Sequence, residues 1–273
     1  MIEPILSIGN GSVTTLRDGT LSLEVALFHG AENALQLASG PIAAAANAYL
    51  YRTDDTTMLI DAGGGGMLPG TGHLAACLAN LNVKPDDIDV IFCTHLHPDH
   101  IGGLVLDEKP VFAKATLWVN AAEIAFWGDA DIRAAAPAEA QDFFAAATAV
   151  LAAYGDRLHP FSGTVSPLPN TRTVPLLGHT PGHTGLMIGE GRDGLFVWGD
   201  IVHAEDLQLA YPDASIAFDV DPEQAIATRK ATLARVVQEG LRVAGGHLST
   251  PGFGHIHPQG DGYVFAPEEF KAS

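Results

Sequence analysis

The stretch CTHLHPDHIGG, residues 93–103, places three histidines and one aspartate within six positions, from His95 to His100. Imidazole rings crowded in this way repel one another once they are protonated, because like charges interact strongly in a low-dielectric site. A bound cation removes the repulsion, because it holds the rings neutral as its ligands. Neither packing nor turn formation requires this combination of residues, so the stretch predicts a metal site.

The spacing inside the stretch favours two metal positions rather than one. His95 and His97 are two residues apart, which in an extended segment directs both side chains to the same side, so that one cation can bind both. Asp99 and His100 follow after Pro98 has turned the chain. This offset indicates that they bind a second cation.

Three later segments add candidate ligands at expected strand ends: His183 in GHTPGHT, Asp200 in FVWGD and His247 in GGHLS. Taken alone, a histidine beside glycine is more often a hydrogen-bonded loop residue than a ligand. The cluster in residues 95–100 raises the expectation for all three. The complete set suits two four- to five-coordinate divalent ions that share one carboxylate and one solvent oxygen. The predicted ligands are His95, His97, Asp99, His100, His183, Asp200 and His247.

The rest of the chain predicts an α/β protein rich in strands. Short β-like runs fill residues 1–60, and an Asp-Gly turn signal separates SVTTL from LSLEVALF. Helices are predicted over 137–155 and over 221–240, the second with Asp221 as its N-cap and Gly240 at its end. No linker or change of composition divides the chain, so we expect one domain over residues 1–273 in which helices enclose two sheets.

Composition and charge disfavour several classes of partner. The 273 residues include 32 acidic and 14 basic side chains, a formal charge of −18, which disfavours nucleic acid or an anionic membrane as a partner. The amino terminus lacks the features of a secretory signal, and no run reaches the ~18 apolar residues that span a bilayer. We therefore expect a soluble protein. The presence of only two cysteines, Cys77 and Cys93, disfavours a disulfide framework and suits a cytoplasmic protein.

The pattern His-x-His-x-Asp-His, residues 95–100, resembles the hallmark of the metallo-β-lactamase fold superfamily. The resemblance extends over essentially the whole chain and implies a four-layer αββα sandwich of two mixed sheets. It also implies that Asp61 orients ligands through hydrogen bonds, although the sequence alone suits a turn-capping aspartate nearly as well. His179, which begins HTPGHT, is expected to support the site rather than to bind a metal beside His183. The ligands that it implies are His95, His97 and His183 for one metal, Asp99, His100 and His247 for the other, and Asp200 as the bridge.

Within the superfamily, the chain most resembles methyl parathion hydrolase and related lactonases. The supporting stretches are GDIVHAEDLQLAYPDASIAFDVDPEQA and PGFGHIHPQGDGYVFAP. The resemblance implies a homodimer and an aromatic pocket, for which Phe126 and Trp127 are candidates, although such residues more often belong to a core. His203 stands where acyl-homoserine lactonases carry tyrosine; we expect it either to hydrogen-bond the substrate or the leaving oxygen, or to be an ordinary buried histidine.

The predicted reaction is hydrolysis without a serine or cysteine nucleophile. Two divalent ions about 3.5–4 Å apart can share one water and lower its pKa toward ~7, which provides hydroxide at neutral pH. Asp99 or Asp200 would then carry the proton. Because few basic residues are present to bind an anion, we expect a small neutral substrate: a lactone, a carboxylic ester or an organophosphate triester. Zinc is the expected metal, and manganese, iron, cobalt and nickel suit the same donors.

Two alternatives remain open at this point. A sulfur dioxygenase with a single iron ion uses a subset of the same ligands. Metal analysis combined with oxygen uptake would identify it. A non-catalytic metal-binding protein would keep the fold without the reaction, although the complete ligand set disfavours it. By resemblance, a β-lactamase in the strict sense is also disfavoured, because those enzymes typically carry cysteine where Asp200 stands.

Overall fold

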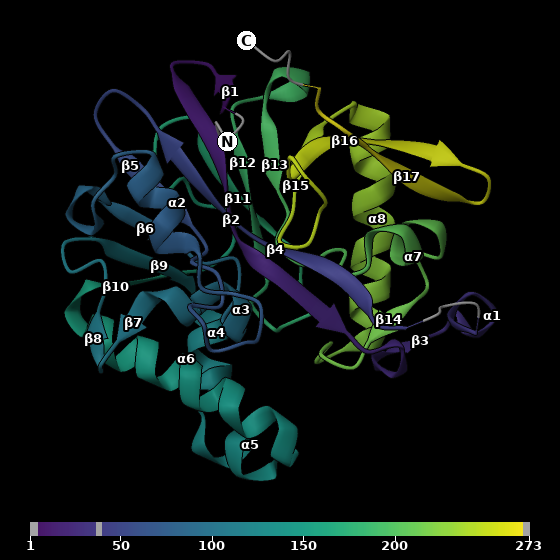
Figure 1. The fold of residues 1–273 in the computed structure, drawn as a ribbon, viewed down its shortest axis with the longest axis horizontal. Coiled ribbons are helices and arrows are strands. Elements are labelled where there is room, and N and C mark those ends of the chain that lie inside the picture. The colour runs from purple at the N-terminus through teal and green to yellow at the C-terminus, as the bar shows by residue number, and fades with distance from the viewer. Residues whose placement is uncertain (1–4, 37–39, 270–273) are drawn as a thin grey trace.

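Two β-sheets lie face to face in the middle of the protein (Figure 1). The computed structural model describes residues 5–36 and 40–269. The first sheet has seven strands in the order β1-β2-β4-β5-β6-β9-β10, which are Ile5–Ile8, Gly11–Leu23, Ile42–Arg52, Thr57–Ile60, Val90–Phe92, Thr116–Asn120 and Leu158–Phe161. The second has six strands in the order β11-β12-β13-β15-β16-β17, which are Thr171–Pro175, Thr184–Ile188, Leu195–Val197, Arg242–Ala244, Phe253–Gln259 and Gly262–Pro267.

The alternation of side chains along the strands explains why each sheet is buried on both faces. In β4, Tyr49 and Tyr51 pack into the core between the sheets, whereas Leu50 packs into the core on the outer face of the first sheet. In β13, Leu195 faces the central core and Phe196 faces the outer side of the second sheet. Because neighbouring side chains in a strand point to opposite faces, strands that are apolar at every position need cover on both sides.

Helices supply that cover and complete the expected αββα layers. They are α2 (Leu74–Asn80) and α6 (Gln141–Tyr154) on the first sheet and α8 (Pro222–Glu239) on the second. The side chain of Asp221 accepts the backbone N–H of Gln224, and Gly240 ends α8 in the left-handed conformation, with φ 64°. Both ends of α8 therefore agree with the predicted helix. The helix predicted from residue 137 begins at Gln141, because a short 3₁₀ turn precedes it.

The shorter elements surround the ends of the sheets, and α5 stands out from the body of the molecule beyond α6 (Figure 1). They are β3 (Phe28–His29), α1 (Glu32–Leu35), α3 (Pro98–Ile101), β7 (Val105–Leu106), β8 (Lys109–Pro110), α4 (Ala121–Trp127), α5 (Ala130–Ala135), α7 (Glu205–Ala210) and β14 (Ser215–Ile216). Within the described residues, no helix has the length and apolar character needed to cross a membrane.

Candidate metal centre

The candidate ligands lie where strand ends of the two sheets meet. β5 and β6 run parallel in the first sheet, and β13 and β15 run parallel in the second. The carboxyl ends of parallel strands lie at the same edge of a sheet, and here they are followed by Asp61, His95, Asp200 and His247. β12 runs antiparallel to β13, so the loop before β12, which contains His179, reaches the same edge.

A first group consists of His95, His97 and His179, whose ligand atoms lie within 4.8 Å of one another. The Nε2 atoms of His95 and His179 lie 3.7 and 3.5 Å from Oδ2 of Asp200. Burial lowers the pKa of His95 and of His97 well below the usual value, and neighbouring histidines lower it further. Both rings are therefore neutral, which is the form that binds a metal.

The sequence predicted His183 as the third histidine of this group. The structure contradicts that prediction, because the group contains His179 and not His183. The two ring nitrogens of His183 are occupied: Nδ1 lies 2.9 Å from the carbonyl oxygen of Leu176, and Nε2 accepts the backbone N–H of Asp200 at 3.1 Å. In His179, Nδ1 lies 2.8 Å from Oδ1 of Asp219, whereas Nε2 has no hydrogen-bond partner among the described residues. The two roles are reversed: His183 holds the loop in place, and His179 points into the group.

A second group consists of Asp99, His100, Asp200 and His247. His100 Nε2 lies 3.1 Å from Oδ1 of Asp200 and 3.5 Å from Oδ2 of Asp99. His247 Nε2 lies 3.0 Å from Oδ2 of Asp200 and 3.5 Å from Oδ2 of Asp99. Asp200 thus contacts both groups. A side chain at Gly246 would place its Cβ 2.6 Å from Oδ1 of Asp200, so only glycine leaves room for this carboxylate.

Unsatisfied buried atoms show that the cluster suits divalent cations. The Nε2 atoms of His95, His100 and His179 and Oδ1 of Asp200 are buried and have no hydrogen-bond partner in the described part of the chain. Polar atoms left in this state cost free energy, and a cation in each group would satisfy them. Imidazole and carboxylate donors together suit zinc and related divalent transition metals. The groups therefore fit a divalent metal, without selecting which one.

Hydrogen bonds on the far side of the rings hold the histidines in position. Nδ1 of His100 lies 2.8 Å from Oδ2 of Asp61, which also places its Oδ1 2.8 Å from the backbone nitrogen of Thr94. Asp61 therefore contacts His100 directly, and its role in orienting a metal ligand stays a prediction. Nδ1 of His247 lies 2.7 Å from the carbonyl oxygen of Ala45. A partner at Nδ1 fixes the tautomer that turns Nε2 toward a metal. The corresponding partner of His179, Asp219, was not predicted.

A second unpredicted carboxylate, Glu123 in α4, joins the two ligand loops. It is completely buried. Its Oε2 accepts the backbone N–H of Leu96 at 3.0 Å and the indole N–H of Trp127 at 2.8 Å, and its Oε1 accepts the backbone N–H of Gly182 at 2.7 Å. Leu96 lies between two ligands and Gly182 lies in the loop of His179, so Glu123 fixes the distance between the loops.

His203 lies beside both groups. Its Nε2 is 3.2 Å from Oδ2 of Asp200, and its ring stacks on that of His247 with the centroids 5.1 Å apart. Burial lowers the pKa of His203 to about 4, although Asp200 acts in the opposite direction. Nδ1 has no hydrogen-bond partner in the residues described here. A neutral ring with this nitrogen free can hydrogen-bond a molecule that enters the site.

Two neighbouring cavities open beside the groups. One of about 310 Å³ is lined by His97, Asp99, Asp200, His203 and His247 together with apolar residues. The other, of about 680 Å³, is mostly apolar and shares His97 with the first. Three apolar residues also line both cavities: Leu27, Phe143 and Phe218.

The aromatic residues expected to form the pocket reach only the larger cavity. Phe126 and Trp127 line it, and the ring of Trp127 contacts that of His97 with the centroids 5.4 Å apart. Sequence reasoning missed Phe143 and Phe218, which stand between the larger cavity and the cluster. Phe143 belongs to the helix predicted over 137–155, but nothing in the helical pattern distinguishes it from a core residue.

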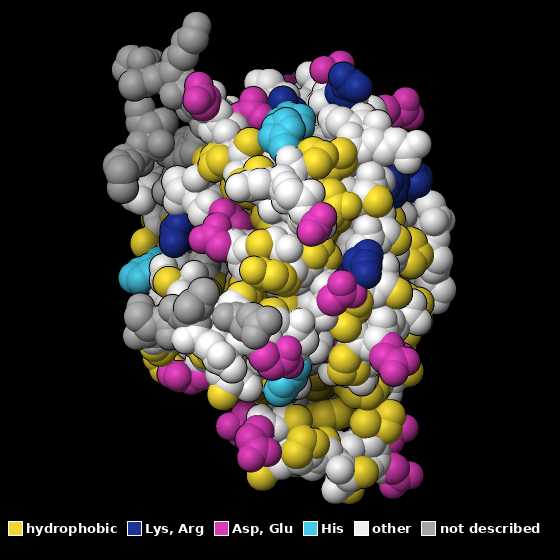
Figure 2. Space-filling view, turned by 90° about the vertical axis from the view of Figure 1, so that its right-hand side faces the viewer, with side chains coloured by type: hydrophobic (Ala, Val, Ile, Leu, Met, Phe, Trp, Pro, Cys, Tyr) yellow, Lys and Arg dark blue, Asp and Glu magenta, His cyan; other side chains and the backbone are white. Residues whose placement is uncertain are grey.

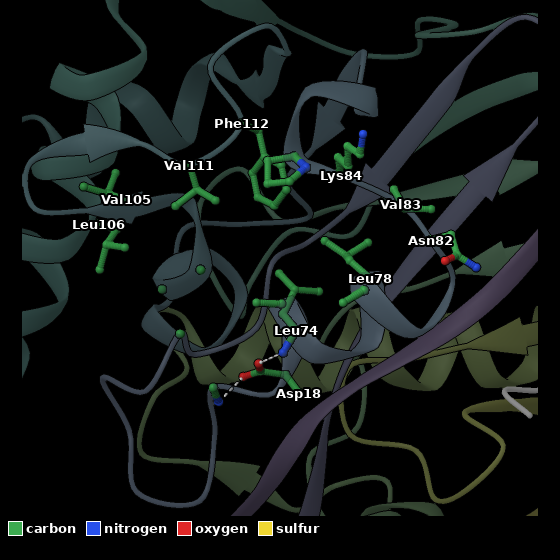
Figure 3. Close-up of a pocket in the computed structure, with 17 residues that line it drawn as sticks. Asp18, Leu74, Leu78, Asn82, Val83, Lys84, Val105, Leu106, Val111 and Phe112 are labelled. Atoms are coloured by element: carbon green, nitrogen blue, oxygen red, sulfur yellow. Dashed lines mark hydrogen bonds between the residues drawn. The ribbon is translucent and has the colours of Figure 1, made fainter. Parts of the chain in front are cut away.

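A third cavity, of about 570 Å³, lies between α2 and the β7–β8 segment (Figure 3). Apolar side chains such as Leu74, Leu78 and Phe112 form its walls, and Asp18 lies at one side. The carboxylate of Asp18 accepts backbone N–H groups of Gly64 and Leu74, both at 2.8 Å. It therefore secures the glycine-rich loop that follows Asp61 rather than binding in the metal cluster.

Comparisons with known proteins identify the family and the fold. Residues 42–247 match the sequence model of the metallo-beta-lactamase superfamily. The crystal structure of AbOPH, a hydrolase of the beta-lactamase superfamily, is 27% identical with a TM-score of 0.88, and the match covers 100% of both chains. AidC, described as a dizinc quorum-quenching lactonase, is 27% identical with a TM-score of 0.90, over 99% of this chain and 98% of that one.

A shorter match links the chain to a curated protein. The probable metallo-hydrolase MJ0296 of Methanocaldococcus jannaschii is 43% identical over 49 residues, which is 18% of this chain. The match spans only 22% of that relative's own length.

Proposed function

The chain belongs to the metallo-beta-lactamase superfamily, and on this basis we propose that it is a dinuclear metal-dependent hydrolase of neutral ester-type bonds. The observation that supports the proposal most is the contact of one carboxylate, Asp200, with two buried ligand groups. A cavity opens directly onto these groups, so a substrate can reach them. The hydrolase relatives support the same class of reaction.

The proposed ligands come from the two groups of the cluster. Bound divalent cations would supply a Lewis acid and a water of lowered pKa at neutral pH. The residues that hold them are His95, His97 and His179 in one position, Asp99, His100 and His247 in the other, and Asp200 between the two.

Asp99 is the proposed carrier of the proton. Its side chain is 13% exposed and lines the cavity, whereas that of Asp200 is 2% exposed and is surrounded by imidazoles. Asp99 is therefore better placed to take a proton from the attacking water and to deliver it to the leaving oxygen. His203 is the proposed hydrogen-bond partner of the substrate oxygen, because it lines the same cavity and its Nδ1 has no partner in the described structure.

The substrate is proposed to be a small neutral molecule with an apolar arm. The ester-type bond would lie in the smaller cavity, and the arm would pass Phe143 and Phe218 into the larger one. The charge of −18 disfavours an anion or a nucleic acid. On the face shown in Figure 2, lysine and arginine side chains are scattered and form no continuous basic patch. Because AidC is named a lactonase, lactones are the first substrates to test.

A substrate panel tests the proposal. The metal-free protein would be reloaded with zinc, manganese or cobalt and assayed on alkyl lactones, p-nitrophenyl esters, a dialkyl aryl phosphotriester and an anionic phosphodiester. We expect turnover that a chelator abolishes, with neutral substrates preferred over the diester by at least about a hundredfold. Asp200→Asn should be inactive, and Asp193→Asn, at an exposed position, should behave as wild type.

Other outcomes would point elsewhere. Absence of metal-dependent turnover on every neutral substrate, or preference for the diester, would contradict the proposal. One iron per chain with oxygen uptake would identify the dioxygenase alternative. Metal binding without any reaction would identify a metal-binding protein. The homodimer remains a prediction that sedimentation of the metal-loaded protein tests.

A further inference from the structure

A buried arginine, Arg229, lies behind the first ligand group. It belongs to α8, and only 1% of its surface is exposed. Its Nε donates to the carbonyl oxygen of Ile201 at 2.7 Å, and its Nη1 donates to those of Pro212, at 3.1 Å, and Ala214. Ile201 directly follows Asp200 in the chain. Burial of a guanidinium is costly unless it is paired and hydrogen-bonded. The presence of a buried arginine at this position therefore needs a physical reason.

Arg229 also faces the carboxylate that holds His179. Its Nη2 lies 4.0 Å from Oδ2 of Asp219, whose side chain is 0% exposed. Oδ2 accepts the backbone N–H of Ile216 at 3.1 Å, and Oδ1 lies 2.8 Å from Nδ1 of His179. The carboxylate of Asp219 therefore lies between a guanidinium and a candidate ligand.

We infer that Arg229 is a positioning residue for the first metal position: it holds Asp219, and thereby fixes the ring of His179 with Nε2 turned toward the group. The inference rests on the proposed function, because it takes His179 to be a ligand. Neither the sequence pattern nor the family match assigns a role to Arg229.

A guanidinium suits this task better than an ammonium. Its planar fork donates in several directions at once, so it can serve three carbonyl oxygens and still face Asp219, whereas lysine has one nitrogen at the end of a flexible chain. Leu233 and Val236 of the same helix are buried in the core beneath the second sheet. This packing fixes the position of α8. Through Arg229 and Asp219, the helix therefore determines where the ring of His179 lies.

Metal titration of matched variants tests the inference. Metal-free wild type, Arg229→Met, Asp219→Asn and the double variant would be titrated with cobalt, and the visible spectrum would report each position separately. We expect Arg229→Met and Asp219→Asn each to weaken one position about 10–100-fold and to leave the other within about twofold. The double variant should be no weaker than Asp219→Asn, because residues that act through one contact are not additive. Arg235→Met, which removes a partly exposed ion pair with Glu239 on the same helix, should match wild type.

Several results would overturn the inference. Equal weakening of both positions, additive losses in the double variant, or wild-type binding by Arg229→Met would each do so. Arg229→Lys serves if Arg229→Met does not fold: it keeps the charge but not the fork, so selective weakening is expected and wild-type binding contradicts the inference. His179→Ala separates the two proposals. If it keeps both metals, the proposed ligand set is wrong; if it loses one while Arg229→Met keeps both, only the role of Arg229 is wrong.

Discussion

A histidine can bind a metal only through a ring nitrogen that nothing else occupies. His179 and His183 lie four residues apart in the same loop, and both are buried. In His183, Leu176 and Asp200 occupy the two nitrogens, so the ring acts as a strut between the loop and the strand end that carries Asp200. In His179, one nitrogen is held by Asp219 and the other faces the cluster. Hydrogen bonding, rather than position in the chain, decides between them.

We predict that His179 and His183 differ in what they contribute. His179→Ala should lose one metal per chain, or bind it at least about tenfold more weakly, with a modest change in stability. His183→Gln should keep both metals, because the residue supplies no ligand atom. Elemental analysis after dialysis against a metal buffer measures this directly. Loss of metal from His183→Gln with full retention in His179→Ala would restore the assignment first expected from the sequence.

We also predict that His183 makes the protein sensitive to acid. Burial lowers its pKa from 6.5 to about 3. The unfolded chain therefore binds a proton between these values that the folded chain does not, so the contribution of His183 to stability is complete above pH 6.5 and is lost as the pH falls toward 3. The slope approaches about 1.4 kcal/mol per pH unit.

His183→Gln keeps a hydrogen-bond acceptor but cannot take up the proton. In chelator, where no metal is released, the free energy of unfolding of wild type should fall more steeply from pH 6.5 to 4 than that of the variant. Parallel curves from urea denaturation would show that His183 does not titrate in this way.

Residues that act locally could be predicted from the sequence, and residues that act across the fold could not. Neither packing nor turn formation requires the crowding of His95, His97, Asp99 and His100, so the pattern alone indicates a metal site. Nothing in the sequence distinguishes Asp219 from the neighbouring acidic residues; its partner His179 lies 40 residues away and is found only when the loops are folded. The same is true of Arg229 and Glu123.

At the scale of elements, α4 connects the cavity wall to the ligand loops through Glu123. Its carboxylate accepts hydrogen bonds from two loop backbones and from the indole of Trp127. We predict that Glu123→Gln destabilises the protein by about 2–4 kcal/mol, because the amide turns a donor toward N–H groups that need an acceptor. Metal affinity at the first position should fall as well, because the loops of His97 and His179 lose their common support.

Glu108→Gln provides the matched control for Glu123→Gln, since Glu108 is exposed between β7 and β8. Urea denaturation and cobalt titration of both variants give the two measurements. A stability loss below about 0.5 kcal/mol in Glu123→Gln would mean that other contacts fix the loops.

The sequence predicted the type of an element correctly where local propensity and tertiary contacts favour the same conformation. The capping residues Asp221 and Gly240 correctly predicted where α8 begins and ends. The Asp-Gly signal after Arg17 misled, because SVTTL and LSLEVALF contribute to one strand, β2, with only a shift of register at that point. There Asp18 is turned inward to accept N–H groups of the glycine loop instead of forming a turn. The hairpin of β16 and β17 was missed, because its glycine and proline content resembles a loop, yet it pairs at the edge of the second sheet.

At the scale of the whole molecule, the cluster joins the two sheets. The loops and short helix that follow β6 of the first sheet supply His95, His97, Asp99 and His100, and the second sheet supplies His179, Asp200 and His247. The central core between the sheets depends on apolar burial, whereas the edge at the cluster brings carboxylates and imidazoles into a buried site. Cations bound there would convert this edge from a source of unsatisfied atoms into a link between the two sheets.

We therefore predict that metal removal lowers the stability of the whole protein. A ligand present at about a hundred times its dissociation constant stabilises the folded state by about 2.7 kcal/mol per site. Chelator empties both sites, so for a chain of this size the midpoint of thermal unfolding should fall by about 10–20 °C and recover when zinc is added. Asp200→Asn removes the carboxylate common to both groups, so the midpoint of this variant should change much less than that of wild type when chelator or zinc is added. Equal midpoints for metal-loaded and metal-free wild type, with the metal content verified, would show that the sheets hold together without the cations.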